Sequence, residues 1–224
     1  MPLPKKSLKC IYCQKKLNKE NIENILLNEI SNKDKMGIGV APFLVSMKRY
    51  KINGYKYIKL NYPGINYKNL EIYKDRIIIR QLNQKNLICA TYDNFSLTSQ
   101  SYYNLKIVKS PIEEFNNYFL LGLINSRLIS YFCFKAFSSY KKLFPRLLIE
   151  RIKKIPIVIP KTPDEKKIAL DITKKVRSIL NLHENEKDGE KMLDTRNIER
   201  ELDNLVFKLY IIDGNFQKFI LNSF

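Results

Sequence analysis

The sequence predicts an α+β fold, in which a twisted mixed β-sheet with one buried helix is followed by an antiparallel helical hairpin. Between residues 36 and 108, short runs rich in β-branched and aromatic residues alternate with Gly, Pro and Asn, which is typical of strands and turns. An apolar segment of helical length comes next, and two apolar stripes at helical spacing follow it. Strands are expected at residues 40–47, 55–60, 76–80, 87–92 and 104–108.

Residues 115–137 are aliphatic or aromatic on nearly every face, which predicts a helix buried against the sheet. Part of this segment, residues 118–137, is as long as a membrane-spanning helix. It contains Asn125, Arg127 and Lys135, however, and polar or charged side chains are costly in a bilayer. Burial inside the protein is therefore the favoured interpretation.

Two further helices are expected to pair as a hairpin. Thr162, Pro163 and Glu165 indicate a helix start, with Thr162 as N-cap, Pro163 in the first turn and Glu165 closing a capping box. Thr195 can cap the second helix after a polar loop. The apolar stripes contain Ile168, Ile172, Val176 and Ile179 in the first helix and Ile198, Leu202, Leu205, Leu209 and Ile212 in the second.

Composition divides the chain into three parts. Residues 1–35 are polar and rich in Lys and Asn, with one helix expected at residues 21–30, and are interpreted as an adapter or a truncated junction. Residues 36–160 are expected to form the α/β domain that carries the function. Residues 161–224 are expected to form the helical hairpin and a tail.

Charge is unevenly distributed along the chain. The formal net charge is +18, but residues 183–224 hold six basic and nine acidic residues, so residues 1–182 carry about +21. This asymmetry favours a dedicated anion-binding face, and nucleic acid is the first partner to expect. The alternative is that an AT-rich genome enriches Lys whatever the function. No signal peptide is recognisable, so we expect the cytoplasm.

No catalytic residue is assigned. The sequence has no Walker loop, no G-x-G-x-x-G motif and a single histidine, His183. Its nearest string to the Asn/Asp-Pro-Pro-aromatic motif of DNA methyltransferases is Asn61-Tyr62-Pro63-Gly64, which does not qualify. Asp164-Glu165-Lys166 has the residue types of a metal-dependent nuclease but is explained by the helix cap. We therefore expect neither activity nor a cofactor in this chain alone.

Cys10 and Cys13 form a C-x-x-C pair, which is half of a structural zinc site. The other two cysteines, Cys89 and Cys133, lie far away in apolar stretches. No metal is therefore expected, and Cys10 with Cys13 is only a weak candidate site.

Several stretches together carry a resemblance to a known family. They are Ser46-Met-Lys-Arg-Tyr50, Asp75-Arg-Ile-Ile-Ile-Arg-Gln81, Ile88-Cys-Ala-Thr-Tyr-Asp93, Leu120-Leu-Gly-Leu-Ile-Asn-Ser-Arg-Leu-Ile-Ser-Tyr131 and Leu143-Phe-Pro-Arg146 followed by Ile155-Pro-Ile157. In order and spacing they resemble the TaqI-like C-terminal specificity domain, over residues 36–212. That family supplies the target-recognition part of adenine-specific DNA methyltransferases and of single-chain restriction-modification enzymes.

The resemblance implies that residues 36–160 form an α/β DNA target-recognition domain, which grips duplex DNA beside a catalytic domain that flips adenine out for methylation. Such domains usually follow a methyltransferase domain in the same chain, whereas about 35 unrelated residues precede this one. The chain is therefore expected to work with a separate methyltransferase or endonuclease subunit, or to be a fragment of a split or decayed gene.

Two sets of polar side chains are candidates for DNA contacts. Arg and Gln can make bidentate hydrogen bonds to guanine or adenine, so base reading is assigned to the strand end and turn that hold Arg80, Gln81, Gln84 and Lys85. Phosphate binding is assigned to Lys48, Arg49, Lys141, Lys142, Arg146, Arg151, Lys153 and Lys154.

Two other functions stay open from the sequence. In the first, the chain is a non-catalytic protein-interaction subunit whose hairpin docks a partner enzyme and whose basic charge is mostly compositional bias. In the second, the Tyr- and Lys-rich residues 50–73 bind RNA by stacking on its bases.

Overall fold

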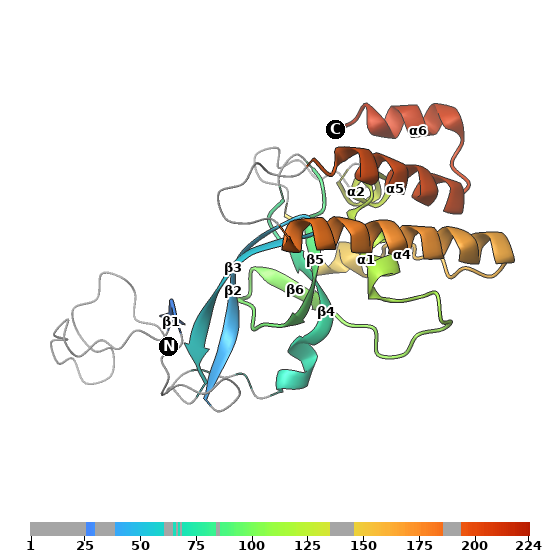
Figure 1. Cartoon of the computed structure of the whole chain (residues 1–224). Coiled ribbons are helices and arrows are strands. Elements are labelled where there is room, and N and C mark those ends of the chain that lie inside the picture. The colour runs from blue at the N-terminus through green and yellow to red at the C-terminus, as the bar shows by residue number, and fades with distance from the viewer. Residues whose placement is uncertain are drawn as a thin grey trace, which may run out of the picture.

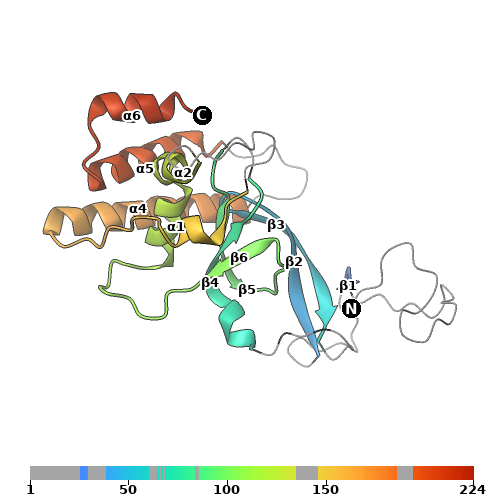
Figure 2. The ribbon, with the colours of Figure 1, turned by 180° about the vertical axis from the view of Figure 1, so that it is seen from behind.

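The computed structural model describes residues 26–29, 39–60, 65, 67, 69–83, 86–134, 146–185 and 194–224. Within these ranges the α-helices gather at one end of the molecule and the strands extend away from them, whereas the short helix at residues 70–73 lies at the strand end (Figures 1 and 2). The strands are β1 (Leu26–Leu27), β2 (Val40–Lys48), β3 (Lys51–Lys59), β4 (Lys74–Arg80), β5 (Ala90–Phe95) and β6 (Tyr102–Leu105). The helices are η2 (Leu70–Tyr73), a 3₁₀ helix, and α1 (Asn117–Asn125), α2 (Arg127–Phe134), α3 (Ile149–Ile152), α4 (Pro163–Glu184), α5 (Arg196–Leu209) and α6 (Gly214–Leu221). The predicted α+β class is confirmed.

β2 and β3 form an antiparallel hairpin, with β1 on the other side of β3. The hairpin turns at Arg49 and Tyr50, and Tyr50 adopts a left-handed conformation with φ of 58°. The register shifts on either side of Ser46, where β2 is irregular. Such irregularities bend a strand and increase its twist.

The second sheet is antiparallel, and β4 lies between β5 and β6. Ile77, Ile78 and Ile79 of β4 are fully buried, although successive side chains of a strand point to opposite faces. Both faces are covered, since Ile77 and Ile79 belong to the core that includes the helices, whereas Ile78 packs in a cluster with Leu44 and Met47 of β2. β4 is therefore the central strand of the molecule.

A short parallel bridge between Phe43 and Leu97 joins the two sheets. The Leu44 N–H donates to the Leu97 carbonyl oxygen at 2.8 Å, and the Leu97 N–H donates to the Pro42 carbonyl oxygen at 2.7 Å. Parallel and antiparallel pairing thus both occur, as expected of a mixed sheet. The strands form two three-stranded sheets, however, instead of a single one.

The predicted buried helix consists of two helices, α1 and α2, that meet at Ser126. Ser126 has an extended backbone with ψ of 153°, which ends α1. Its Oγ accepts a hydrogen bond from the Ile129 N–H at 3.2 Å, as an N-cap residue does at a helix start. Seven of the nine residues of α1 are buried, so the expected burial is confirmed.

Side chains of α1 and α2 complete the hydrogen bonding of the chain that leads into β5. The Asn125 carboxamide accepts from the Ala90 N–H at 3.0 Å and donates to the Ala90 carbonyl oxygen at 2.9 Å. Ser130 Oγ accepts from the Ile88 N–H at 3.1 Å. These contacts satisfy buried backbone groups that would otherwise lack partners, and they fix the helices against the second sheet.

The predicted hairpin is formed by α4 and α5, and the capping box at the start of α4 is confirmed. Thr162 Oγ1 accepts from the Glu165 N–H at 3.2 Å, and Glu165 Oε2 accepts from the Thr162 N–H at 3.0 Å. Thr195 stands at the N-cap position of α5, but the prediction that it caps this helix is wrong, because its hydroxyl donates to the Glu199 carboxylate at 3.0 Å and bonds no backbone N–H of α5. α6 was not predicted; the Asp213 carboxylate caps it by accepting from two backbone N–H groups. A single core cluster holds residues of β4, β5 and the long helices, and the division of the chain at residue 161 stays a prediction.

The helix predicted at residues 21–30 is wrong for its described part. Leu26 and Leu27 form a strand that pairs with Ile58 and Tyr57 of β3. Pairing with the open edge of β3 outweighs the local helical periodicity, because strand formation depends on neighbouring strands more than on intrinsic preference. Residues 21–25 and 30 lie outside the described residues. In the described ranges, no helix combines the length and apolar character that crossing a membrane requires.

Candidate nucleic-acid interface

The end of β4 and a segment 65 residues later lie side by side. Leu82 pairs with Arg146 in an antiparallel bridge, and the Leu147 N–H donates to the Gln81 carbonyl oxygen at 2.8 Å. The structure therefore brings together Arg80 and Gln81, which are predicted base-reading residues, and Arg146, a predicted phosphate-binding residue.

These side chains line a hollow of about 410 Å³, formed by residues 80–82, residues 100–102 and Arg146. Two arginines, Arg80 and Arg146, are among its lining residues. Guanidinium groups bind base edges and phosphates because they present several N–H donors in a fixed plane. The hollow is thus a positively charged site whose donors suit nucleic acid.

Gln81 forms the floor of this site and is 8% exposed. Its Nε2 donates to the Gln100 carbonyl oxygen at 2.5 Å, and its Oε1 accepts from Arg146 Nη2 at 2.7 Å. Its backbone N–H donates to the Ser101 carbonyl oxygen at 3.0 Å. Gln81 therefore links the end of β4 to residues 100–101 on one side of the hollow and to Arg146 on the other.

Arg80 is half-buried, and its backbone pairs with Tyr102 of β6. In the part of the chain that the structure describes, its guanidinium makes no hydrogen bond or ion pair. The hydroxyl of Tyr102 donates to the Val45 carbonyl oxygen of β2 at 3.3 Å, which ties the rim of the hollow to the first sheet. Arg80 is thus placed on a rigid element with its donors available.

Three predicted phosphate-binding residues follow Arg146 along the chain. Arg151 is half-buried and donates to the Cys133 carbonyl oxygen at 3.0 Å. Lys153 is exposed and pairs with Glu150 at 3.0 Å, and Lys154 is exposed as well. Exposed ion pairs contribute little, so Lys153 can exchange its carboxylate for a phosphate at small cost.

Lys48 and Arg49 lie where β2 turns into β3, in the first sheet. Lys48 is exposed at the end of β2. Arg49 forms an ion pair with Glu199 of α5 at 2.7 Å and also contacts the Ile88 carbonyl oxygen at 3.4 Å. The charge of Arg49 is therefore balanced inside the protein, and its role in phosphate binding stays a prediction.

Several predicted residues lie outside the described ranges, namely Gln84, Lys85, Lys141, Lys142, Cys10 and Cys13. Within the ranges described, no three His, Cys, Asp or Glu side chains stand close enough to hold a metal ion. Burial raises the pKa of Cys89 and of Cys133 to about 11. Both thiols therefore stay protonated at neutral pH, which disfavours metal binding and nucleophilic chemistry.

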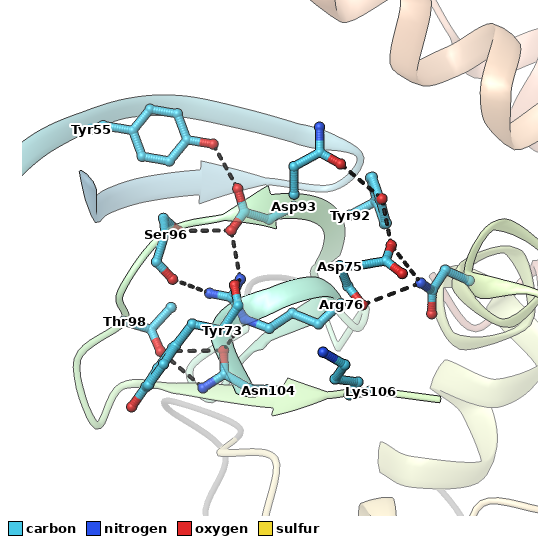
Figure 3. Close-up of polar contacts among 12 residues, drawn as sticks. Tyr55, Tyr73, Asp75, Arg76, Tyr92, Asp93, Ser96, Thr98, Asn104 and Lys106 are labelled. Carbon is cyan, nitrogen blue, oxygen red and sulfur yellow. Dashed lines mark hydrogen bonds and ion pairs between the residues drawn. The ribbon is translucent and has the colours of Figure 1, made fainter. Parts of the chain in front are cut away.

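A buried polar network among the strands of the two sheets is not predicted by the sequence (Figure 3). Arg76 of β4 is fully buried and pairs with Asp93 of β5 at 2.8 Å. Arg76 Nε donates to Asn104 of β6 at 2.7 Å, and the Tyr55 hydroxyl reaches from β3 to donate to Asp93 at 2.9 Å. The network therefore connects both sheets. Its sequence signal is Arg76 itself, a charged residue next to the buried isoleucines of a central strand.

The sequence also did not indicate residues 100–102 as part of the site. They join the hollow because β6 pairs with β4 in a register that places Tyr102 opposite Arg80. Strand pairing of this kind cannot be read from local periodicity, since it depends on residues far apart in sequence.

Comparison with known proteins gives two matches. The family described as TaqI-like C-terminal specificity domain matches residues 42–157, which is about half of the chain. A protein of Methanocaldococcus jannaschii, named "Putative type II restriction enzyme and methyltransferase", is 29% identical over 147 residues. The match covers 65% of this chain but only 12% of that relative.

Proposed function

Because the chain belongs to the family of TaqI-like C-terminal specificity domains, we propose that it binds duplex DNA at a particular sequence, as the target-recognition component of a restriction-modification system. A separate adenine methyltransferase or endonuclease part supplies the chemistry. That part is expected to take the target adenine out of the stack, while this chain holds the duplex in place.

The observation that carries this proposal is the convergence of Arg80, Gln81 and Arg146 on one hollow. Arg is the side chain that most often makes specific contacts with guanine, through its O6 and N7 atoms. Arg80 ends β4 and pairs with Tyr102 of β6, and Arg146 is held by its bridge to Leu82 just after β4. Rigid placement favours discrimination between bases.

Phosphate contacts are proposed for the exposed basic residues that follow Arg146 along the chain, especially Lys153 and Lys154. Phosphate contacts fix the register of a protein on DNA without reading the sequence. The +21 charge of residues 1–182 supports this role, because a basic surface attracts a polyanion over long range.

Salt dependence of binding tests the proposal against a protein-interaction role. Fluorescence anisotropy with the full chain and a random-sequence duplex should show affinity falling by about 10³-fold between about 50 and 200 mM salt, as six or more phosphate contacts require. Binding that barely changes with salt would favour the protein-interaction subunit instead. Competition by single-stranded RNA that exceeds competition by duplex DNA would favour RNA binding.

Lys154→Gln provides the residue-level arm of this experiment. It should weaken binding to every duplex equally and reduce the slope of the logarithmic salt plot by about 1. Lys208→Gln is the matched control, because Lys208 is also exposed but lies on α5, away from the hollow. Equal effects of the two substitutions would remove Lys154 from the interface.

A further inference from the structure

Both ends of the Gln81 carboxamide are hydrogen-bonded inside the protein. Its nitrogen donates to the Gln100 carbonyl oxygen at 2.5 Å, and its oxygen accepts from Arg146 Nη2 at 2.7 Å. Reading adenine by a bidentate contact requires both the oxygen and the nitrogen of a Gln side chain. Because both ends are engaged at a position that is only 8% exposed, Gln81 is poorly placed to present them together to a base.

Arg146 differs from Gln81 both in exposure and in the share of its polar atoms that is hydrogen-bonded. It is exposed, and only one of its nitrogens bonds to Gln81. A guanidinium carries five N–H donors in one plane, so several remain for another partner. The bond to Gln81, together with the backbone bridge to Leu82, restrains this guanidinium at the hollow that Arg80 also lines. A contact that only neutralises phosphate does not need such fixation, whereas a bidentate contact to a base does.

We propose, on the basis of the proposed DNA-binding function, that Arg146 reads a guanine edge together with Arg80, and that Gln81 is the positioning residue that presents the Arg146 guanidinium. The base-reading set therefore includes a residue that the sequence favours as a phosphate ligand, and Gln81 acts through Arg146 instead of touching DNA.

Selection of duplexes from a pool with a randomised central block tests this assignment, using the full chain. Arg146→Ala should remove the preference for guanine at one base pair, with a loss of discrimination of about 5- to 150-fold there, while affinity for unselected duplex falls less. Lys154→Gln is the control, since it should lower retention of all duplexes and leave the selected sequence unchanged.

The positioning role of Gln81 is tested by a double-mutant cycle. Gln81→Leu should lose the preference at the same base pair as Arg146→Ala, and the double variant should lose no more than Arg146→Ala alone, because the two residues act as one unit. Thermal unfolding of each variant identifies those that fold. If Gln81→Leu does not fold, Arg146→Ala still decides the central assignment.

The outcomes separate this inference from the function on which it rests. If the wild-type chain enriches no sequence, sequence-specific binding is contradicted and the inference fails with it. If the wild type enriches a sequence and Arg146→Ala keeps the same preference with uniformly lower retention, Arg146 binds phosphate and only the inference is overturned. Loss of preference at different base pairs in the two single variants would likewise overturn the positioning role of Gln81.

Discussion

At the scale of single residues, Arg76 is the central charge of the polar network that includes residues of both sheets. It is fully buried, pairs with Asp93 and also donates to the carbonyl oxygens of Tyr73 and Ser96. Removing one partner of a buried ion pair leaves an uncompensated charge, which costs about 3–5 kcal/mol. Arg76→Met should therefore lower the free energy of unfolding by about this amount in urea denaturation.

Lys74→Met is the control for this prediction, because Lys74 lies on the same strand but forms an exposed ion pair with Glu71. Such pairs contribute about 1 kcal/mol or less. If Arg76→Met were as mild as Lys74→Met, the network of Figure 3 would not be a structural connection between the sheets.

The two described cysteines give a second prediction at this scale. Burial raises the pKa of Cys89 and Cys133 to about 11, and only the thiolate reacts readily with alkylating reagents. Peptide mapping after brief iodoacetamide treatment at neutral pH should therefore find both largely unmodified in the native protein and modified after denaturation. Full labelling of either thiol in the native protein would contradict the burial described for it.

At the scale of elements, the contact between α1 and α4 depends on Gly122. A Cβ atom at this position would lie 2.5 Å from Ile172 Cγ2 and 3.1 Å from Val176 Cγ2. The helices would have to move apart, and overpacking of this kind costs about 1–3 kcal/mol. Gly122→Ala should lower the melting temperature, whereas Gly214→Ala in α6, where nothing lies within 4 Å, should not. Equal melting temperatures would show that the α1–α4 contact is loose.

The elements also show how much of the fold the sequence predicts. Strong apolar patterns predicted β2, β4, α4 and α5, because these patterns mark the faces that become buried, and the capping box predicted the start of α4. The break at Ser126 was missed, since an apolar segment gives no periodic contrast at the point where a helix ends. α6 has a start that residue type indicates, since Asp213 is a favoured N-cap residue and accepts from two backbone N–H groups.

The candidate site was predictable only in part for a related reason. Arg80 and Gln81 follow a clear strand, so their place at its end could be expected. Their contact with Arg146 depends on a bridge across 65 residues, and no local pattern indicates that pairing. Nor does residue type reveal that both ends of the Gln81 carboxamide are occupied within the protein.

At the scale of the whole molecule, acidic side chains of residues 183–224 form ion pairs with basic side chains of residues 1–182. Glu199 pairs with Arg49, and the buried Asp203 accepts from the backbone and the side chain of Arg127. These carboxylates hold α5 against the β2–β3 turn and α2, and they neutralise the charges of Arg49 and Arg127. The remaining positive charge is therefore available to surfaces such as the hollow at the end of β4.

The most direct test of sequence-specific DNA recognition is a ratio of two dissociation constants measured for the full chain. One is for the duplex enriched from a randomised pool, and the other is for a shuffled duplex of the same composition at the same salt concentration. We predict that the enriched duplex binds at least about tenfold more tightly, since one base pair that is read directly contributes about 1–3 kcal/mol. Equal dissociation constants for the two duplexes would contradict the account.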